Sequence, residues 1–318
     1  MDFNEFKNTL MDLVSKEVED RGIENLSMKF TTIDSPDGQN ERLMVSVGDS
    51  KMSMAFRLNE IYKSIEDGED IDHAVFKMVN TIESSITVIK TKEDEVKDFV
   101  SNYENVKDHT YLRMIPGNSP VLKDTPHKMI EDMALVVNIH LDSLTDDNGR
   151  SCVVISKPLM EMYGIDEKQL FADAEKNSIE NEPIVFRPLV DMIKGLIENE
   201  EIPDPADMGI VTYIATNASG FQGAAVAGYP DFAEKAAEAL GGSFYMLPSS
   251  VHEFILIKDD GTPKAKDLNA MIRNVNETVL EPRDILSAQC YHYDAKTKVL
   301  ETGLNYAQRT QQRKGGVR

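Results

Sequence analysis

The chain has 318 residues, of which 41% are hydrophobic and 28% are charged. This length exceeds what one hydrophobic core usually serves and the composition is typical of a folded chain, so we expect packed units and exclude general disorder. The formal net charge of -21 at pH 7 argues against binding to nucleic acid or to anionic membranes, because both require clustered Lys and Arg.

Cys152 and Cys290 are the only cysteines, too few for a disulfide framework or a cysteine-rich zinc site. Each lies in an apolar run, so we expect buried thiols. The N-terminal segment MDFNEFKNTL lacks the basic and apolar regions of a secretory signal, and no apolar run approaches the length of a membrane span. These features predict a cytoplasmic protein.

The first part of the chain alternates helical and strand patterns. Apolar residues at spacings of three and four predict a helix over residues 2–20, and alternating apolar residues predict strands around 26–30, 43–47 and 52–56. Further helices are expected over 58–66, 70–86 and 91–103, with Asp70 as an N-cap. A short strand over 111–115 follows.

A second unit is expected to start near residue 120. Strands over 133–141 and 151–155 flank Asn148-Gly149, a strong hairpin signal. Ser156 and Asp166 are expected to begin two helices. Later elements are a helix over 188–197, a strand over 209–215, a helix over 231–240, a strand pair over 243–257, a helix over 265–280 and a hairpin over 289–300.

Strands that come in adjacent pairs between helices predict an α+β fold, with mixed or antiparallel sheets and flanking helices in two units. We place the N-terminal unit at residues 1–118 and the larger unit at 119–304. The remaining residues, 305–318, are rich in Arg and contain no acid, and they are expected to form a flexible basic tail.

Two long stretches carry a family resemblance. YMLPSSVHEFILI at 245–257 and NETVLEPRDILSAQCYHYDAKTKVL at 276–300 resemble a bacterial family known only as domain of unknown function 5688. The stretch from MALVVNIH to FADAEKN is similar to the same family in order and spacing. The resemblance covers most of the chain and implies no substrate, cofactor or catalytic residue, because the family has no established activity.

The candidate catalytic residues are Ser249, Ser250, His252 and Glu253, which lie within five residues at the turn predicted for Pro248–Ser250 and directly after it. A zinc protease motif is excluded because the second His is missing. A hydrolase would need a serine hydroxyl bonded to the imidazole and a third group that orients the ring, with Asn276 and Asp284 as further candidates. The alternative is a structural turn, in which local backbone binds the hydroxyls and a neighbouring carboxylate binds the histidine.

No other motif indicates chemistry. The six His are widely scattered, and the spacing of Gly220, Gly223 and Gly228 fits neither a dinucleotide nor a phosphate loop, so a closely packed strand of small residues is expected there. We therefore expect no metal and no cofactor.

The leading hypothesis is a non-enzymatic binding module with a protein partner and no nucleic-acid or membrane partner. Its contacts would come from an acidic surface or from a methionine-lined groove. Alternatives are an unrecognised hydrolase at the serine–histidine turn and an acidic inhibitor that mimics DNA. Residues considered for these surfaces are Glu66, Asp67, Glu69 and Asp70, then Glu198, Glu200 and Glu201, and finally Met44, Met52, Met54 and Met78.

Overall fold

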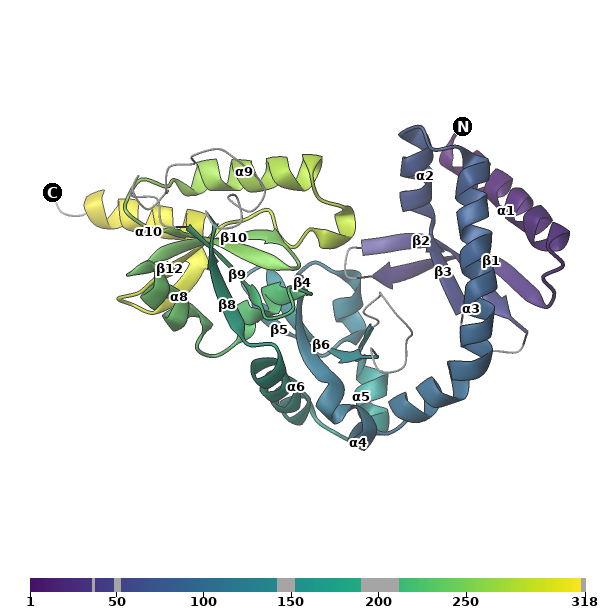
Figure 1. Ribbon diagram of the computed structural model, residues 1–318. Coiled ribbons are helices and arrows are strands. Elements are labelled where there is room, and N and C mark those ends of the chain that lie inside the picture. The colour runs from purple at the N-terminus through teal and green to yellow at the C-terminus, as the bar shows by residue number, and fades with distance from the viewer. Residues whose placement is uncertain (36–37, 49–52, 142–151, 190–211, 316–318) are drawn as a thin grey trace, which may run out of the picture. The chain divides into compact units, whose positions relative to one another are not determined.

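The computed structural model describes residues 1–35, 38–48, 53–141, 152–189 and 212–315 (Figure 1). Contacts divide the chain into two compact units, the first made of the described residues up to Asn105 and the second of those from Val106 onward. The boundary therefore precedes the one expected after residue 118. The reason is that β4 (Thr110–Pro116) pairs with β6 (Met133–His140), deep in the second unit.

The first unit combines three helices with a small antiparallel sheet (Figure 1). Its elements are α1 (Phe3–Asp20), β1 (Leu26–Ser35), β2 (Gly38–Val47), β3 (Ser53–Arg57), α2 (Leu58–Glu66) and α3 (Ile71–Val100). The strands lie in the order β1-β2-β3. Phe6 and Leu10 of α1 pack with Leu43 of β2 and Val79 of α3 in one core, so the helices cover the apolar face of the sheet.

Helix α3 is longer than predicted. Asp70 caps it as expected, accepting a hydrogen bond from the Asp72 backbone N–H at 3.2 Å, but the helix continues to Val100 where two helices were expected. No Gly or Pro occurs between Ile71 and Val100. The middle of this segment contains β-branched residues, Asn80, Ser84 and Ser85, which lower helix propensity without ending a helix.

The first sheet of the second unit is built around β6, which pairs with β4, β5 (Lys128–Ile130) and β7 (Cys152–Val154). The predicted hairpin of β6 and β7 is confirmed, while its Asn148-Gly149 turn lies outside the described residues. The short helix α4 (Tyr103–Val106) precedes β4, and helices α5 (Lys157–Tyr163) and α6 (Glu167–Asn181) follow β7. Ser156 and Asp166 cap α5 and α6 as predicted.

The second sheet has six strands in the order β13-β12-β10-β11-β9-β8. Its strands are β8 (Ile184–Pro188), β9 (Thr212–Asn217), β10 (Phe244–Ser250), β11 (Glu253–Lys258), β12 (Tyr291–Asp294) and β13 (Val299–Thr302). The segments between these strands contain the α-helices α8 (Phe232–Leu240) and α9 (Ala265–Thr278) and the 3-10 helices η3 (Gly223–Gly228) and η4 (Pro282–Asp284). All its strand pairs are antiparallel, so the predicted α+β class is confirmed. The helix expected from Pro188 begins one residue later, at Leu189, because Pro188 ends β8, and the other expected residues of this helix lie outside the described ranges.

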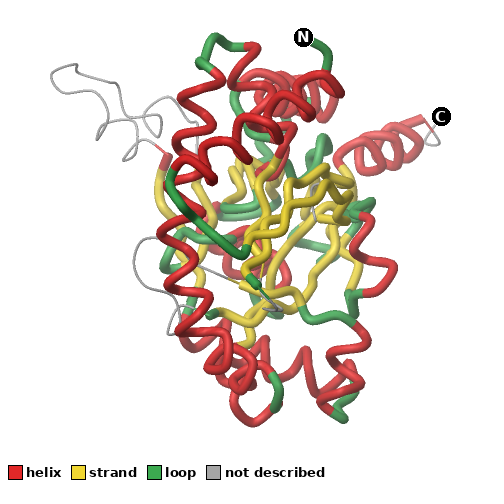
Figure 2. The backbone as a smooth tube through the Cα atoms, turned by 90° about the vertical axis from the view of Figure 1, so that its right-hand side faces the viewer, coloured by secondary structure: helices red, strands yellow, loops and turns green. Residues whose placement is uncertain are grey.

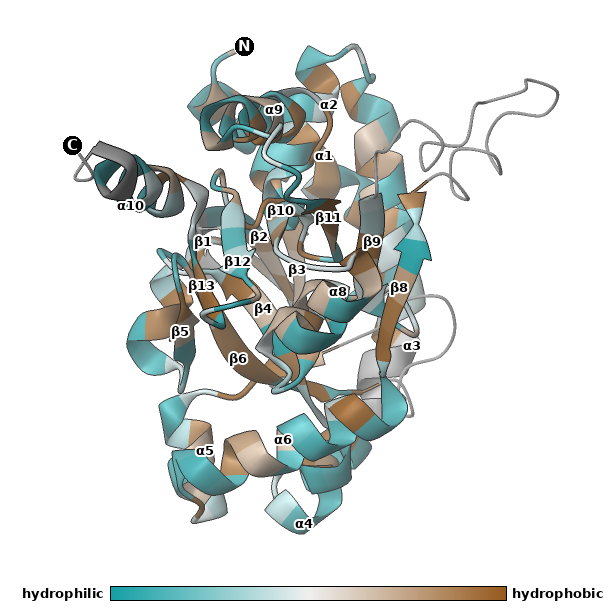
Figure 3. Ribbon diagram, turned by 90° about the vertical axis from the view of Figure 1, so that its left-hand side faces the viewer, coloured by the Kyte–Doolittle hydropathy of each residue, from teal (hydrophilic) through white to brown (hydrophobic). Residues whose placement is uncertain are grey.

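The expected flexible tail forms helix α10 (Gly303–Gly315) instead. Leu304 and Tyr306 pack against the apolar cluster beneath α9, and Arg309 bonds Glu301 at 2.5 Å. A side chain on Gly303 would meet Cys290 Sγ at 2.6 Å, so the helix begins where only glycine fits. Figures 2 and 3 show α10 extending away from the strands of its unit.

Hydropathy follows the layers of the second unit. Figure 3 shows hydrophobic colour along β6 and hydrophilic colour on much of α6, and residues Met133 to Ile139 of β6 are all buried. Among the helices of the described residues, none has the length and apolar character needed to cross a bilayer.

Candidate functional site

The four candidate catalytic residues lie at the turn between β10 and β11. Ser249 and Ser250 belong to the end of β10, and the pairing register shifts between Pro248 and Ser250. The sequence predicted the turn at Pro248–Ser250, but the turn is made by the next two residues, Val251 and His252. The extra residues are accommodated by the bulge in β10, which a sequence pattern of apolar residues does not reveal.

The imidazole of His252 contacts a different neighbour at each nitrogen. Nδ1 accepts a hydrogen bond from the Gln222 backbone N–H at 3.0 Å, so the proton of the neutral ring lies on Nε2. Nε2 faces Asp284 Oδ1 at 3.7 Å, and the two side chains are 37% and 29% exposed. At 3.7 Å the two groups approach as an ion pair would, but they are too far apart for a hydrogen bond.

The two serines bond elsewhere. Ser250 Oγ accepts from the backbone N–H of His252 at 3.0 Å, and Ser249 Oγ donates to Glu253 Oε1 at 3.3 Å. Activation of a serine requires a hydrogen bond from its hydroxyl to the imidazole, and Nδ1 already accepts from backbone. Asn276 donates to the Ser287 carbonyl at 3.1 Å, whereas Asp284 lies beside His252.

Close packing of the glycine-rich segment holds this turn. Thr216 Oγ1 donates to the His252 carbonyl at 2.8 Å, and a Cβ on Gly223 would lie 2.5 Å from that same carbonyl oxygen. Close packing is therefore present at Gly223, but the expected strand of small residues is wrong, because Gly223–Gly228 forms the 3-10 helix η3. Gln222, at φ 51°, also donates through Nε2 to Cys152 Sγ at 3.5 Å; Cys152 is half-buried, while Cys290 is fully buried.

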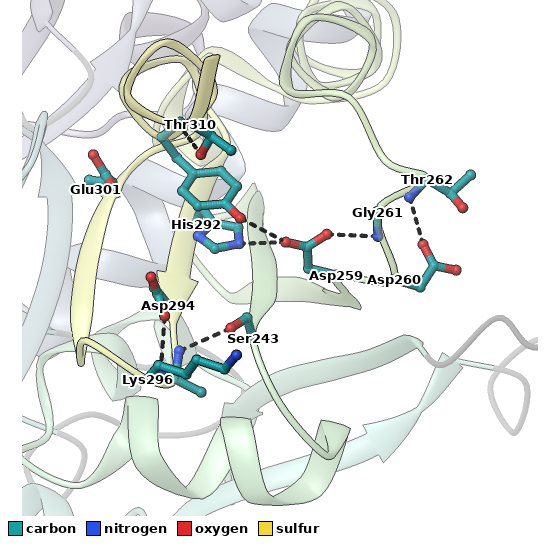
Figure 4. Close-up of polar contacts among 12 residues, drawn as sticks. Ser243, Asp259, Asp260, Gly261, Thr262, His292, Asp294, Lys296, Glu301 and Thr310 are labelled. Carbon is teal, nitrogen blue, oxygen red and sulfur yellow. Dashed lines mark hydrogen bonds and ion pairs between the residues drawn. The ribbon is translucent and has the colours of Figure 1, made fainter. Parts of the chain in front are cut away.

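A second histidine–carboxylate pair lies in the interior of the same unit (Figure 4). His292 Nε2 is 2.9 Å from Asp259 Oδ2, and the ring of Tyr306 stacks on the imidazole with centroids 3.4 Å apart. The Tyr306 hydroxyl donates to the same carboxylate oxygen at 3.3 Å. The hydrogen bond from His292 holds the pKa of Asp259 below its usual value, against the opposing effect of burial. The pair thus fastens α10 to the sheet.

A pocket in the first unit, which we call the β3 groove, has the features of a ligand site. Its volume is about 410 Å³, within the range of small-ligand pockets. The lining residues come from β3, α2 and α3, and from the turn between the two helices. They are Ala55, Phe56, Arg57, Glu60, Ile61, Ser64, Glu69, Ala74, Lys77, Met78 and Thr81.

Helical spacing brings these side chains together. Glu60, Ile61 and Ser64 share one face of α2, and the α3 positions from Ala74 to Thr81 recur at spacings of three and four, so each helix presents a single stripe. Met78 is only 4% exposed and closes the floor of the groove. The spacing of apolar residues in the sequence predicts the two helices, but it does not show that these faces of α2 and α3 line one pocket.

Both signs of charge line the rim of the β3 groove. Arg57 pairs with Glu60 at 3.1 Å and Lys77 with Glu69 at 2.6 Å. The hydrogen bond from Lys77 is the main reason that the pKa of Glu69 lies below its usual value.

The predicted methionine-lined groove is present only through Met78. Met54 packs against the core of the unit, and Met44 adjoins the buried Val45 on β2, so its side chain points to the other face of the sheet. Met52 lies outside the described residues. Of the acidic residues considered, Glu69 lines the groove, Glu66, Asp67 and Asp70 lie at the α2–α3 turn, and Glu198, Glu200 and Glu201 lie outside the described residues.

Within the described residues, no group of three or more His, Cys, Asp or Glu side chains is arranged to hold a metal ion. No curated protein and no solved structure matches the chain. A family of unknown function, DUF5688, matches residues 3–295, nearly the whole sequence. The chain therefore belongs to the DUF5688 family.

Proposed function

We propose that the protein is a binding module whose partner occupies the β3 groove. The observation that supports this most directly is the pocket of about 410 Å³ formed by β3, α2 and α3. It combines an apolar floor with a few placed charges, the combination that gives ligand sites both affinity and orientation.

The contacts at the β10–β11 turn favour binding over catalysis. His252 Nδ1 accepts from backbone at 3.0 Å, and each serine hydroxyl has a partner other than the imidazole. A nucleophile–base pair would require rearrangement of these contacts, whereas the β3 groove needs none to admit a ligand.

Capture experiments with matched variants test the proposal. The tagged full-length chain, Thr81→Trp, Glu83→Trp and His252→Ala are each incubated with an extract of the host, and bound proteins are identified by mass spectrometry. Thr81 is exposed and lines the groove. Glu83 lies on the opposite side of α3, since two helical residues are separated by about 200°.

A partner retained by wild type, Glu83→Trp and His252→Ala, but reduced at least tenfold by Thr81→Trp, supports the proposal. Capture that Thr81→Trp leaves unchanged contradicts the assignment of the groove. Loss of capture only in His252→Ala would move the site to the β10–β11 turn.

A further inference from the structure

We infer that the β3 groove receives an extended peptide segment, which adds as a fourth strand beside β3 and carries a basic residue toward the α2–α3 turn. This inference deepens the proposed function by naming the chemical class of the partner. It rests on three features of the first unit: the position of β3 at the end of the sheet order, an adjoining groove and an acidic turn.

Strand β3 is an edge strand. The sheet has the order β1-β2-β3, and within the described residues β3 pairs only with β2. Successive side chains of a strand point to opposite faces of its sheet. Ala55 and Phe56 are successive residues and both line the groove, so we place the groove beside the edge of β3.

An extended chain is the ligand that such an edge selects. Edge strands present a row of backbone N–H and C=O groups with the spacing of a neighbouring strand, and peptides bind many proteins by completing that row. A five-residue strand such as β3 offers an edge of roughly 17 Å, longer than most small molecules could pair with. The backbone hydrogen bonds would supply affinity without depending on sequence.

The groove then supplies side-chain selectivity. Alternate side chains of an added strand would point toward α2 and α3, where Phe56, Ile61 and Met78 line the groove. Phe56 and Ile61 are part-buried, and Met78 is buried. An apolar side chain at that position would lose its contact with water, whereas its neighbours would face solvent. The segment should therefore alternate apolar and polar residues.

The charge of the α2–α3 turn favours a basic residue at one end of the segment. Residues 66–72 read EDGEDID, five carboxylates with no Lys or Arg, and Glu69 of this turn lines the groove. Arg57 and Lys77 are already paired with Glu60 and Glu69. A Lys or Arg of the partner would thus meet an excess of negative charge, and salt would weaken this contribution.

A peptide library tests the inference on the full-length protein. Fluorescent seven-residue peptides alternate a varied apolar residue with Thr and carry Lys or Glu at either end, and binding is measured by anisotropy. The best binder is then made in two N-methylated forms, one for each set of alternate amides. In an antiparallel or parallel strand only one set of N–H groups faces β3, so only one methylated form should lose affinity.

We expect a Lys-ended peptide to bind, one N-methylated form to bind at least tenfold more weakly, and the other to bind within about threefold of the parent. Thr81→Trp should weaken binding at least tenfold and Glu83→Trp should not. Replacement of the terminal Lys by Glu should weaken binding severalfold at low salt and less at high salt.

Three outcomes would overturn strand addition. They are equal binding of both N-methylated forms, absence of any binder below about 1 mM, and a dimer of the protein itself that Thr81→Trp dissociates in sedimentation. If the first or second occurs while Thr81→Trp still abolishes capture of a partner, the groove remains the binding site and only the peptide assignment fails. If Thr81→Trp affects neither peptide nor partner, the proposed function fails as well.

Discussion

Two histidine–carboxylate pairs in the second unit differ in burial and in consequence. His252 and Asp284 approach to 3.7 Å with side chains 37% and 29% exposed, whereas His292 and Asp259 are 2.9 Å apart and 1% and 13% exposed. Charged or strongly polar groups gain little from pairing in water and depend on their partners when buried. The sequence drew attention to the first pair, but the second should carry the larger share of stability.

The largest effect is expected from His292→Ala. Removal of the ring leaves the Asp259 carboxylate buried without its main partner and deletes the surface on which Tyr306 stacks, so a loss of about 3 kcal/mol is expected. The readout is labelling of Cys290 by a thiol reagent in a Cys152→Ser background. Cys290 is fully buried and burial raises the pKa of its thiol to about 11, so it should react mainly when the unit opens.

His292→Gln provides the control for this change. Its side-chain amide can still donate to Asp259, so it should lose less stability than His292→Ala. Equal labelling of Cys290 in wild type and His292→Ala would show that the buried pair contributes nothing to the unit.

A pH series sharpens the role of the carboxylate. The pKa of Asp259 is lowered, chiefly by the hydrogen bond from His292, so ionised Asp259 stabilises the fold above its unfolded pKa of about 3.9. This contribution is lost as pH falls from roughly 4 through the lowered folded value. Urea midpoints followed by tyrosine circular dichroism should therefore fall less steeply with acid in Asp259→Asn than in wild type. Parallel acid limbs would contradict the assignment.

The sequence predicts the helix caps and strands of the second unit better than it predicts the contact of α10 or the β3 groove. Caps at Ser156 and Asp166 and the strand pair over 243–257 follow from local signals, because each depends on residues a few positions apart. Tyr306 stacks on His292 and so joins α10 to β12, although the sequence predicted a flexible tail there. The two residues are too far apart in the sequence for a local pattern to predict this contact. The tail carries few apolar residues, so Tyr306, together with Leu304 just before the tail, did not indicate a packed helix.

The β3 groove could not be predicted from the sequence either, because it depends on contacts between elements. Periodicity predicts which face of α2 or α3 is apolar, but the pocket exists because polar positions such as Glu60, Ser64 and Thr81 of both helices flank the edge of β3. That arrangement depends on how the helices pack on the sheet. The prediction of a methionine surface failed in part for the same reason, since Met44 and Met54 differ by the face of the sheet to which they point.

A smaller effect is expected from Tyr306→Phe. The ring can still stack on His292, and only the hydroxyl bond to Asp259 at 3.3 Å is lost, so the cost should be about 1 kcal/mol. Hydrogen exchange of the α10 amides measures it directly. Faster exchange in α10 with little change in β10 would show that the hydroxyl fastens the helix, whereas unchanged exchange in α10 would assign the docking to stacking and to Leu304.

The smallest effect is expected from His252→Ala, and it tests the comparison most directly. The pair with Asp284 is half-exposed and 3.7 Å long, so its loss should cost less than about 1 kcal/mol. One further cost arises because the Gln222 N–H loses its acceptor at 3.0 Å, but the removed ring opens a path for water to replace it. His252→Asn, which can offer an oxygen to that N–H, should recover part of the loss. Cys290 labelling that rises as far in His252→Ala as in His292→Ala would contradict this expectation. The β10–β11 turn would then stabilise the unit as much as the buried pair does, and burial would not determine how much each histidine contributes to stability.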